Sequence, residues 1–126
     1  MRGDEVWFSE LSPRPHDTGM VTMVTQRQSE FELHTRAILG LPTTTELSSP
    51  GASAVIKSER AIEAPAYRGV GTALATADIV RIFGKPISRP HRRVGVVAAS
   101  AATPKEARVI ARRASQSITI DDAPIA

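Results

Sequence analysis

The sequence contains no cysteine, which removes disulfide bridges and cysteine-bound zinc from consideration. Aromatic residues make up only 4% of the chain, too few for a protein that stacks the bases of single-stranded nucleic acid on aromatic side chains. No apolar run is long enough to span a bilayer, and the opening MRGDEVWFSE lacks the apolar core of a signal peptide. These absences predict a cytoplasmic protein, without membrane or nucleic-acid partners, whose core consists of Val, Ile, Leu and Ala.

The chain is instead rich in arginine. It has 16 Lys and Arg residues against 13 Asp and Glu, a formal net charge of +3 and a pI near 10.0. This balance suits a phosphate-bearing ligand, large or small. The length of 126 residues allows one small domain or pieces of two.

The sequence predicts an α+β chain in two parts. The first part begins with a strand at 5–11, followed by a loop with two prolines and a glycine and by the β-leaning segment MVTMVT. A helix follows from Ser29, which forms a capping box with Glu32, and Gly40 ends it. The polar, proline-bearing segment 42–53 marks a boundary, so we expect domains at 1–42 and 43–126.

The second part is predicted to be mostly β with one packed helix. We expect a short helix near 73–77, an irregular segment at 59–72, and strands at 52–58, 78–83, 91–100 and 117–120. The helix begins at Pro104, because Thr103 caps it and Glu106 completes a capping box. Its apolar stripe should pack on the sheet and consists of Ala107, Ile110, Ala111, Ala114 and Ile118.

The stretch FSELSPRPHDTGMVT places charged side chains where the first strand breaks into a loop. Glu10 falls near the end of that strand, on the same face as Phe8, where a carboxylate needs a cation or hydrogen-bond donors. It is either an ordinary ion-paired carboxylate or a Mg²⁺ ligand, since Mg²⁺ takes hard oxygen ligands and usually only one or two carboxylates. The residue alone does not decide between these two interpretations.

The PRPHD segment of this loop is either a stiff turn or a ligand-binding loop. Two prolines reduce the entropy lost when such a loop becomes ordered. Arg14 offers a planar pair of donors to a phosphate or carboxylate, and His16 and Asp17 can contact an amine or a hydroxyl. Asp17 can equally cap the turn, as aspartate often does.

A second basic cluster, FGKP…HRR, contains Lys85, Arg92 and Arg93. It forms either a basic surface hairpin or a phosphate pocket. Adjacent residues of a regular strand point to opposite faces, so both arginines reach one phosphate only if the strand begins after them or carries a bulge. His34 and His91 have no partner at metal-ligand spacing, and no P-loop, GxGxxG, GxSxG or HExxH motif occurs.

FSELSPRPHDTGMVT and SEFELHTRAILGLP together closely resemble the C-terminal part of the formate-dependent phosphoribosylglycinamide formyltransferases, ATP-grasp proteins of purine biosynthesis. The similarity continues in the same order through ASAVI, DIVRIFGKP and RRVGVVAA, and it is weakest over 57–76. HDTG distinguishes these proteins from the sibling carboxylase, carboxyaminoimidazole ribonucleotide synthase, which tends to carry an Asn-Ser-Gly ending there. The resemblance implies the tail of an ATP-grasp domain, a strand, loop and helix, followed by a small mostly β C-terminal domain.

The family couples ATP, formate and glycinamide ribonucleotide through formyl phosphate. The resemblance implies that Glu10 is one of two glutamates holding Mg²⁺ against the ATP phosphates, and that Asp17 contacts glycinamide ribonucleotide. It implies a 5′-phosphate site made of Lys85, Arg92 and Arg93. Arg14 matches the motif as well, and we assign it a catalytic role in orienting a phosphate or the acyl phosphate.

The N-terminal ribonucleotide-binding domain, most of the ATP-grasp domain and the second metal-binding glutamate have no counterpart in these 126 residues. We therefore expect the chain alone to bind ATP and Mg²⁺ poorly and to be inactive. We also expect a homodimer, because a sheet edge is left uncovered. The alternatives are a non-catalytic module that binds an anion such as RNA and a fragment of the carboxylase.

Overall fold

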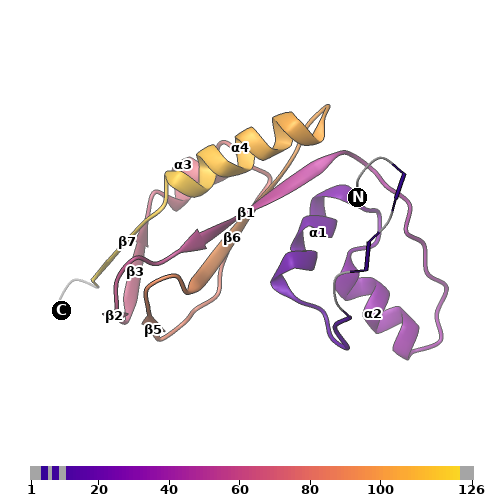
Figure 1. Cartoon of the computed structure of the whole chain (residues 1–126), viewed down its shortest axis with the longest axis horizontal. Coiled ribbons are helices and arrows are strands. Elements are labelled where there is room, and N and C mark those ends of the chain that lie inside the picture. Colours follow the sequence, from indigo (N-terminus) through magenta and orange to yellow (C-terminus); the bar gives the residue numbers. More distant parts are fainter. Residues whose placement is uncertain (1–3, 6, 9–10, 123–126) are drawn as a thin grey trace.

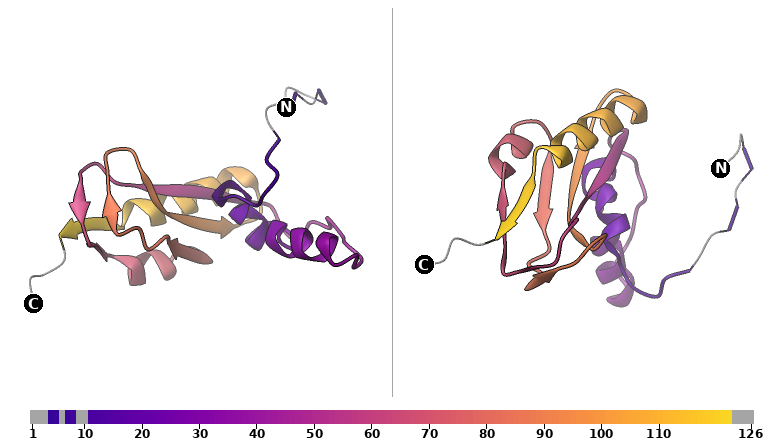
Figure 2. Two further views of the ribbon diagram at one scale, coloured as in Figure 1. Left: turned by 90° about the horizontal axis from the view of Figure 1, so that it is seen from below. Right: turned by 60° about the vertical axis from the view of Figure 1, so that its left-hand side comes forward.

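The computed structural model describes residues 4–5, 7–8 and 11–122 and has the α+β arrangement expected from the sequence. A small helical part at the N-terminal side lies beside a β-rich part that carries one long helix (Figure 1). The two parts are joined by residues 42–50, which contain no helix or strand. Two further views show that the long helix lies along one face of the sheet (Figure 2).

The helical part consists of a 3₁₀ helix η1 (Asp17–Val21), a short α1 (Thr22–Thr25) and α2 (Glu30–Ile38). The β-leaning interpretation of MVTMVT is therefore wrong. The Thr22 hydroxyl donates to the Gly19 carbonyl and also accepts from the Glu30 N–H at 2.8 Å. These local bonds favour a helical turn over an extended strand.

Helix α2 begins where the sequence predicts, since the Ser29 hydroxyl accepts from the Glu32 N–H at 3.3 Å. The Glu32 side chain does not complete a capping box but accepts from Arg36 Nε at 2.8 Å, one turn along the helix. Leu39 caps the helix end, and Gly40 follows it with φ of +65°. The predicted helix stop is therefore confirmed, because this left-handed conformation favours glycine.

The strand predicted at 5–11 is not formed by the residues that the structure describes there. Trp7, Phe8 and Leu11 lie in no strand and are 65%, 83% and 87% exposed. A strand needs a neighbour for its backbone hydrogen bonds, and none of the named strands of the described chain pairs with this segment. Val6, Ser9 and Glu10 lie outside the described residues.

The main sheet of the second part has the order β1-β6-β4, and all its strand pairs are antiparallel. Its strands are β1 (Gly51–Lys57), β4 (Ile79–Ile82) and β6 (Arg93–Ser100). The central strand β6 reads RVGVVAAS, and residues 94–99 are all buried. A continuous run of small and β-branched apolar residues is typical of a strand covered on both faces. Helix α4 (Pro104–Gln116) covers one face, and α1 and η1 also contact β6.

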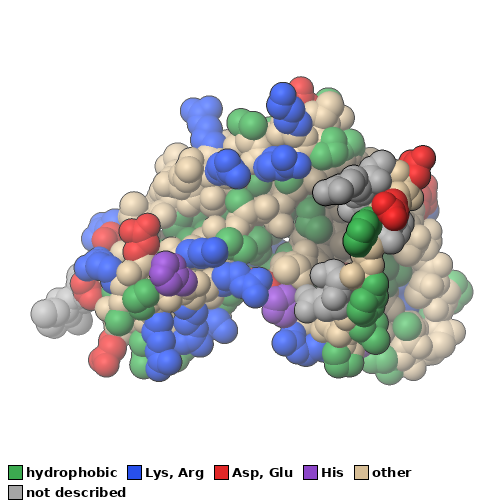
Figure 3. Space-filling model, viewed as in Figure 1, with side chains coloured by type: hydrophobic (Ala, Val, Ile, Leu, Met, Phe, Trp, Pro, Cys, Tyr) green, Lys and Arg blue, Asp and Glu red, His purple; other side chains and the backbone are tan. Residues whose placement is uncertain are grey.

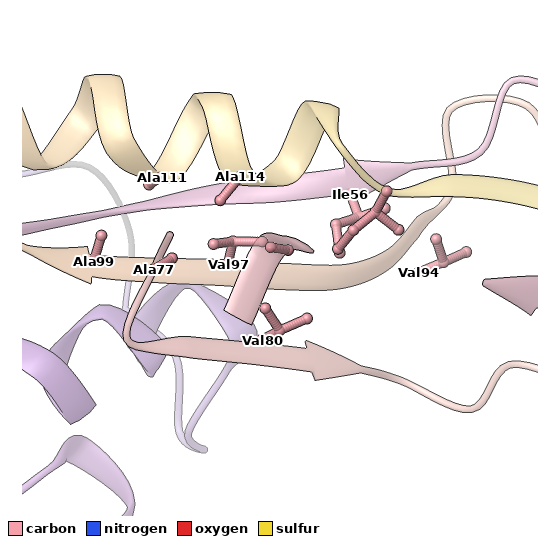
Figure 4. Packing of buried hydrophobic residues seen from close by; sticks show 10 residues of the cluster. Ile56, Ala77, Val80, Val94, Val97, Ala99, Ala111 and Ala114 are labelled. Atoms are coloured by element: carbon pink, nitrogen blue, oxygen red, sulfur yellow. The ribbon is translucent and has the colours of Figure 1, made fainter. Parts of the chain in front are cut away.

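The core lies between α4 and this sheet (Figure 4). Helix α4 approaches the sheet closely because Ala107, Ala111 and Ala114 face it, each no more than 1% exposed. Its start matches the prediction, with Thr103 and Glu106 exchanging the two hydrogen bonds of a capping box at 3.1 and 3.2 Å. Such a cap contributes about 1 kcal/mol to stability.

The segment predicted to be irregular at 59–72 contains short elements instead, namely β2 (Ile62–Glu63), β3 (Pro65–Arg68) and the start of α3 (Val70–Leu74). Strand β2 pairs with β5 (Ile87–Ser88), and β3 pairs with the last strand β7 (Thr119–Asp122). Strands of two to four residues show too little alternation of apolar and polar side chains to be recognised in a sequence. Their hydrogen-bonding partners also lie far away in the chain.

Candidate anion-binding cleft

A cleft of about 490 Å³ lies where the helical part meets the β-rich part. Ten residues line it: Arg14, Pro15, His16, Asp17, Met20, Phe31, Phe83, Lys85, Arg92 and Arg93. Four of them are cationic and one is a carboxylate, so the cleft has a positive balance. Figure 3 shows Lys and Arg side chains gathered on the β-rich part and toward the recess beside the helical part.

The loop before η1 brings its polar side chains to this cleft. His16 is extended, with φ of −135°, and its carbonyl accepts from the Gly19 N–H at 3.0 Å, which starts the 3₁₀ turn at Asp17. Gly19 is buried, and a Cβ there would collide with the Glu30 carboxylate. The Glu30 side chain of α2 therefore lies directly against the turn that presents Asp17, and a larger residue at position 19 would have to displace it.

Asp17 joins the two parts of the molecule. Its Oδ1 accepts from Arg93 Nη1 at 3.0 Å and lies 2.6 Å from His16 Nδ1. His16 Nδ1 also lies 3.5 Å from the Thr18 N–H, but the shorter contact to a carboxylate indicates that Nδ1 carries the proton and donates to Asp17. The Asp17 side chain is only 13% exposed, so its two cationic or donor partners compensate for its desolvation.

Both adjacent arginines reach the cleft because the strand is irregular at this point. Strand β6 begins at Arg93, so Arg92 precedes it and is free of strand alternation. Opposite the start of β6, Ile56 pairs with Gly95 and Lys57 with Arg93, which leaves Val94 as the extra residue of a bulge. A bulge bends the strand and redirects its side chains. The condition derived from the sequence, a late strand start or a bulge, is thus present in the structure.

Two of the remaining cations, Arg92 and Arg14, are held by backbone carbonyls around the cleft. Arg92 Nη1 donates to the Ile87 carbonyl at 3.1 Å, and Arg14 Nη1 donates to the Pro15 carbonyl at 3.2 Å. Each bond uses one donor of a guanidinium that has five, so both side chains keep donors for a ligand. Lys85 follows Gly84, whose φ of +61° allows the turn after β4.

The structure thus brings Arg14, Asp17, Lys85, Arg92 and Arg93 to one cleft. The predicted metal ligand Glu10 lies outside the described residues. No three His, Cys, Asp or Glu side chains of the described chain come together as a metal site would require. Within that same part of the chain, no helix has the length and apolar character needed to cross a membrane.

Sequence reasoning missed the apolar part of the cleft lining. Met20, Phe31 and Phe83 reach the cleft from η1, from α2 and from the segment after β4. No sequence motif marks a residue that borders a cleft between two parts of a chain. Only the packing of α2 beside the turn after β4 could have identified these three residues.

The fold and the cleft define a class, the end of an ATP-grasp domain joined to the small C-terminal domain that follows it. The model of the ATP-grasp domain matches residues 1–31, and the model named "PurT, C-terminal" matches residues 51–118. The second match covers more than half of the chain. The chain therefore belongs to the PurT family, the formate-dependent phosphoribosylglycinamide formyltransferases, and corresponds to their C-terminal part.

Individual relatives agree with this family. The formate-dependent phosphoribosylglycinamide formyltransferase of Methylococcus capsulatus is 62% identical over 109 residues, which are 86% of this chain and 27% of the relative. A crystal structure of N5-carboxyaminoimidazole ribonucleotide synthetase from Thermotoga maritima has a TM-score of 0.83 at 30% identity, over 97% of this chain and 35% of that one. Glycinamide-RNase-transformylase T from Mycobacterium tuberculosis has a TM-score of 0.70 at 35% identity, over 94% and 33%. The chain spans less than a third of the length of its curated relatives.

Proposed function

We propose that the chain supplies the ribonucleotide-binding C-terminal part of an enzyme that formylates glycinamide ribonucleotide with formate and ATP. One observation carries the proposal: residues from the loop before η1 and from the segments around β5 and β6 meet at one positively charged cleft. Arg93 and Asp17 are 76 positions apart in the chain and yet are in direct contact. Within this proposal, the boundary between the ATP-grasp part and the C-terminal domain lies between residues 42 and 43.

The 5′-phosphate of the ribonucleotide is assigned to Lys85, Arg92 and Arg93. Lysine supplies a compact charge, and arginine supplies paired donors that match phosphate oxygens. A ligand of this kind also fits the size of the cleft, because cavities of 300–1,000 Å³ are typical of small-molecule sites. The role of these side chains is binding and orientation.

Asp17 is assigned to the glycinamide end of the substrate. Its Oδ1 already binds Arg93 and His16, which leaves Oδ2 to accept from an amine or a hydroxyl. Arg93 would then contact the phosphate side while fixing the orientation of Asp17. Arg14, on the same loop, is assigned to orient the phosphate or acyl phosphate, with no part in proton transfer, since a guanidinium stays protonated.

ATP is proposed as the phosphoryl donor of the whole enzyme, on the basis of the ATP-grasp match at residues 1–31. Among the described residues, Asp17 is the one carboxylate that lines the cleft, and its Oδ1 is already bonded to two donors, so these residues do not by themselves form a Mg²⁺ site. Glu10 therefore remains a proposed ligand on the resemblance alone, and no step of the chemistry is derived through the metal.

Two rival assignments are weaker on specific grounds. The carboxylase shares the fold, but the relative from Methylococcus capsulatus is 62% identical whereas the carboxylase from Thermotoga maritima is 30% identical. A module for single-stranded RNA is disfavoured because aromatic residues make up only 4% of the chain, too few to stack successive bases.

The test is a titration of the chain with glycinamide ribonucleotide, followed by NMR chemical shifts, which detect weak binding. We expect Lys85→Ala and Arg93→Ala to weaken binding at least about tenfold each, because each removes a charge-assisted contact. Arg108→Ala is the matched control, since it removes one positive charge on α4, outside the cleft. Equal weakening by all three variants, with a steep loss of affinity in added salt, would instead indicate non-specific binding of anions.

The homodimer is also proposed for this chain. Seven large apolar side chains between residues 7 and 47 are exposed: Trp7, Phe8, Leu11, Ile38, Leu39, Leu41 and Leu47. Large apolar side chains favour association where they lie together on the surface. Sedimentation velocity at several protein concentrations tests it, and a single monomeric species up to about 100 μM would contradict it, because stable interfaces reach micromolar affinity or better.

A further inference from the structure

Two buried serines stand behind the cleft. Ser58 and Ser88 are 1% and 0% exposed and are the buried polar side chains of the described residues. Both hydroxyls donate to the same acceptor, the Arg60 carbonyl, at 2.7 and 3.0 Å. Neither serine lines the cleft itself. Because a buried hydroxyl needs a partner, the two serines fix the turn at Arg60 from two sides.

The backbone of Ser58 is bonded to the turn that carries Arg92. The Ser58 N–H donates to the Arg92 carbonyl at 3.0 Å, and the His91 N–H donates to the Ser58 carbonyl at 2.8 Å. His91 has φ of +64°, in the left-handed region that residues other than glycine rarely adopt. Such a conformation persists only where its surroundings hold it in place. The bonds to Ser58 are part of what holds it.

Ser88 acts on the side chain of the same arginine. It is the second residue of β5, and its neighbour Ile87 offers the carbonyl that accepts from Arg92 Nη1 at 3.1 Å. By bonding the Arg60 carbonyl, the Ser88 hydroxyl ties β5 to the turn that also holds Ser58. The backbone and the guanidinium of Arg92 are therefore both anchored to elements that meet at the Arg60 carbonyl.

We propose that Ser58 and Ser88 are positioning residues that hold Arg92 in the orientation needed to bind the substrate phosphate. The assignment of phosphate to this cleft rests on the proposed function above. The serines act only through Arg92 and its turn. Hydroxyls are required there because alanine would remove the bonds to the Arg60 carbonyl while leaving the shape nearly unchanged.

The first measurement needs no ligand and so stands apart from the proposed function. Hydrogen exchange of the His91 amide is measured in the unmodified chain and in Ser58→Ala and Ser88→Ala. We expect exchange to accelerate about fivefold or more in both variants, because the loss of one buried hydrogen bond typically changes an equilibrium by that factor. Thr103→Ala is the matched control, since it removes a hydroxyl bond from the start of α4 and should leave His91 exchange unchanged relative to global unfolding.

The second measurement is the affinity for glycinamide ribonucleotide. Ser58→Ala and Ser88→Ala are expected to weaken it about fivefold, and Ser88→Thr, which keeps a hydroxyl, to restore part of it. Unchanged His91 exchange in both alanine variants would overturn the proposal, as would accelerated exchange with unchanged affinity. If the unmodified chain does not bind glycinamide ribonucleotide at all, the proposed function is wrong, and the role of the serines in phosphate binding through Arg92 is wrong as well. The exchange result still decides whether the serines hold the turn.

Discussion

Replacing Gly69 by alanine should be far more damaging than the same replacement at Gly84, although the two glycines have similar backbone conformations. Their φ angles are +76° and +61°, both in the left-handed region. That conformation costs an L-residue about 1–2 kcal/mol. Alanine also restricts the unfolded chain more than glycine does, and the lower entropy of the unfolded state stabilises the folded protein by about 0.5 kcal/mol. Gly84→Ala, with nothing within 4 Å of its new Cβ, should therefore cost about 1 kcal/mol.

At Gly69 a steric term is added. The new Cβ would lie 1.9 Å from the Ser117 carbonyl oxygen, a backbone atom that cannot rotate away. Ser117 caps the end of α4 and leads into Ile118, which is 7% exposed and belongs to the core. Forcing this junction apart should cost about 1–3 kcal/mol beyond the backbone term, as overpacking does, so we expect about 3 kcal/mol in all.

Thermal unfolding followed by far-ultraviolet circular dichroism distinguishes the two variants. For a chain of 126 residues, 1 kcal/mol corresponds to roughly 3–6 °C in Tm, so Gly84→Ala should lower Tm by roughly that amount and Gly69→Ala by roughly 9–18 °C. Urea titration gives the free energies directly. If the two variants unfold within about 0.5 kcal/mol of each other, the close approach of Gly69 to Ser117 does not exist in solution.

Four further changes test other parts of the structure. Val97→Ala should cost about 2–3 kcal/mol in urea, because Val97 is fully buried beneath α4, and a loss below about 1 kcal/mol would show a looser core. Tyr67→Phe should stabilise the protein by about 1 kcal/mol, since the Tyr67 hydroxyl is buried without a hydrogen-bond partner. Burial also raises the pKa of Tyr67 above its usual 10.0, so the unfolded chain loses this proton first and the stability of the folded chain falls as the pH rises above about 10. The stability difference between Tyr67→Phe and the unmodified chain should therefore grow above that pH, and a constant difference would contradict the burial. A double-mutant cycle of Asp17→Ala and Arg93→Ala should give a coupling of about 1 kcal/mol, modest because the Arg93 side chain is 41% exposed, and zero coupling would mean that the contact does not form in solution.

The long helix could be predicted from the sequence because its signals are local. Thr103, Pro104 and Glu106 lie within one turn, and the apolar stripe repeats with the helical period, so no knowledge of the rest of the fold is needed. The central strand was similarly clear from its run of apolar residues. Both elements carry their evidence in consecutive residues.

The strand interpretation of segment 20–25 failed for the opposite reason, and so did that of Trp7, Phe8 and Leu11 within the strand predicted at 5–11. Threonine, valine and methionine in MVTMVT satisfy a strand pattern, but a strand exists only beside another strand, and in the described chain Thr22 bonds to Gly19 and Glu30 instead. The short strands at 62–68 failed because their partners lie around residues 87 and 120. A pairing over such a distance leaves no trace in local alternation.

The cleft shows how local and distant information combine. Charge and spacing left Lys85, Arg92 and Arg93 as either a surface hairpin or a phosphate pocket, and nothing in the residues between Asp17 and Arg93 indicates that these two meet. They are brought together by the bulge at Val94, which changes the register at the start of β6, and by the 3₁₀ turn that begins at Asp17. An anion that enters the cleft therefore meets an arginine already oriented by a carboxylate from the other part of the molecule. Because Arg93 has five N–H donors and gives only one to Asp17, ligand binding and the contact between the two parts can coexist, and an anion bound there would strengthen the junction it occupies.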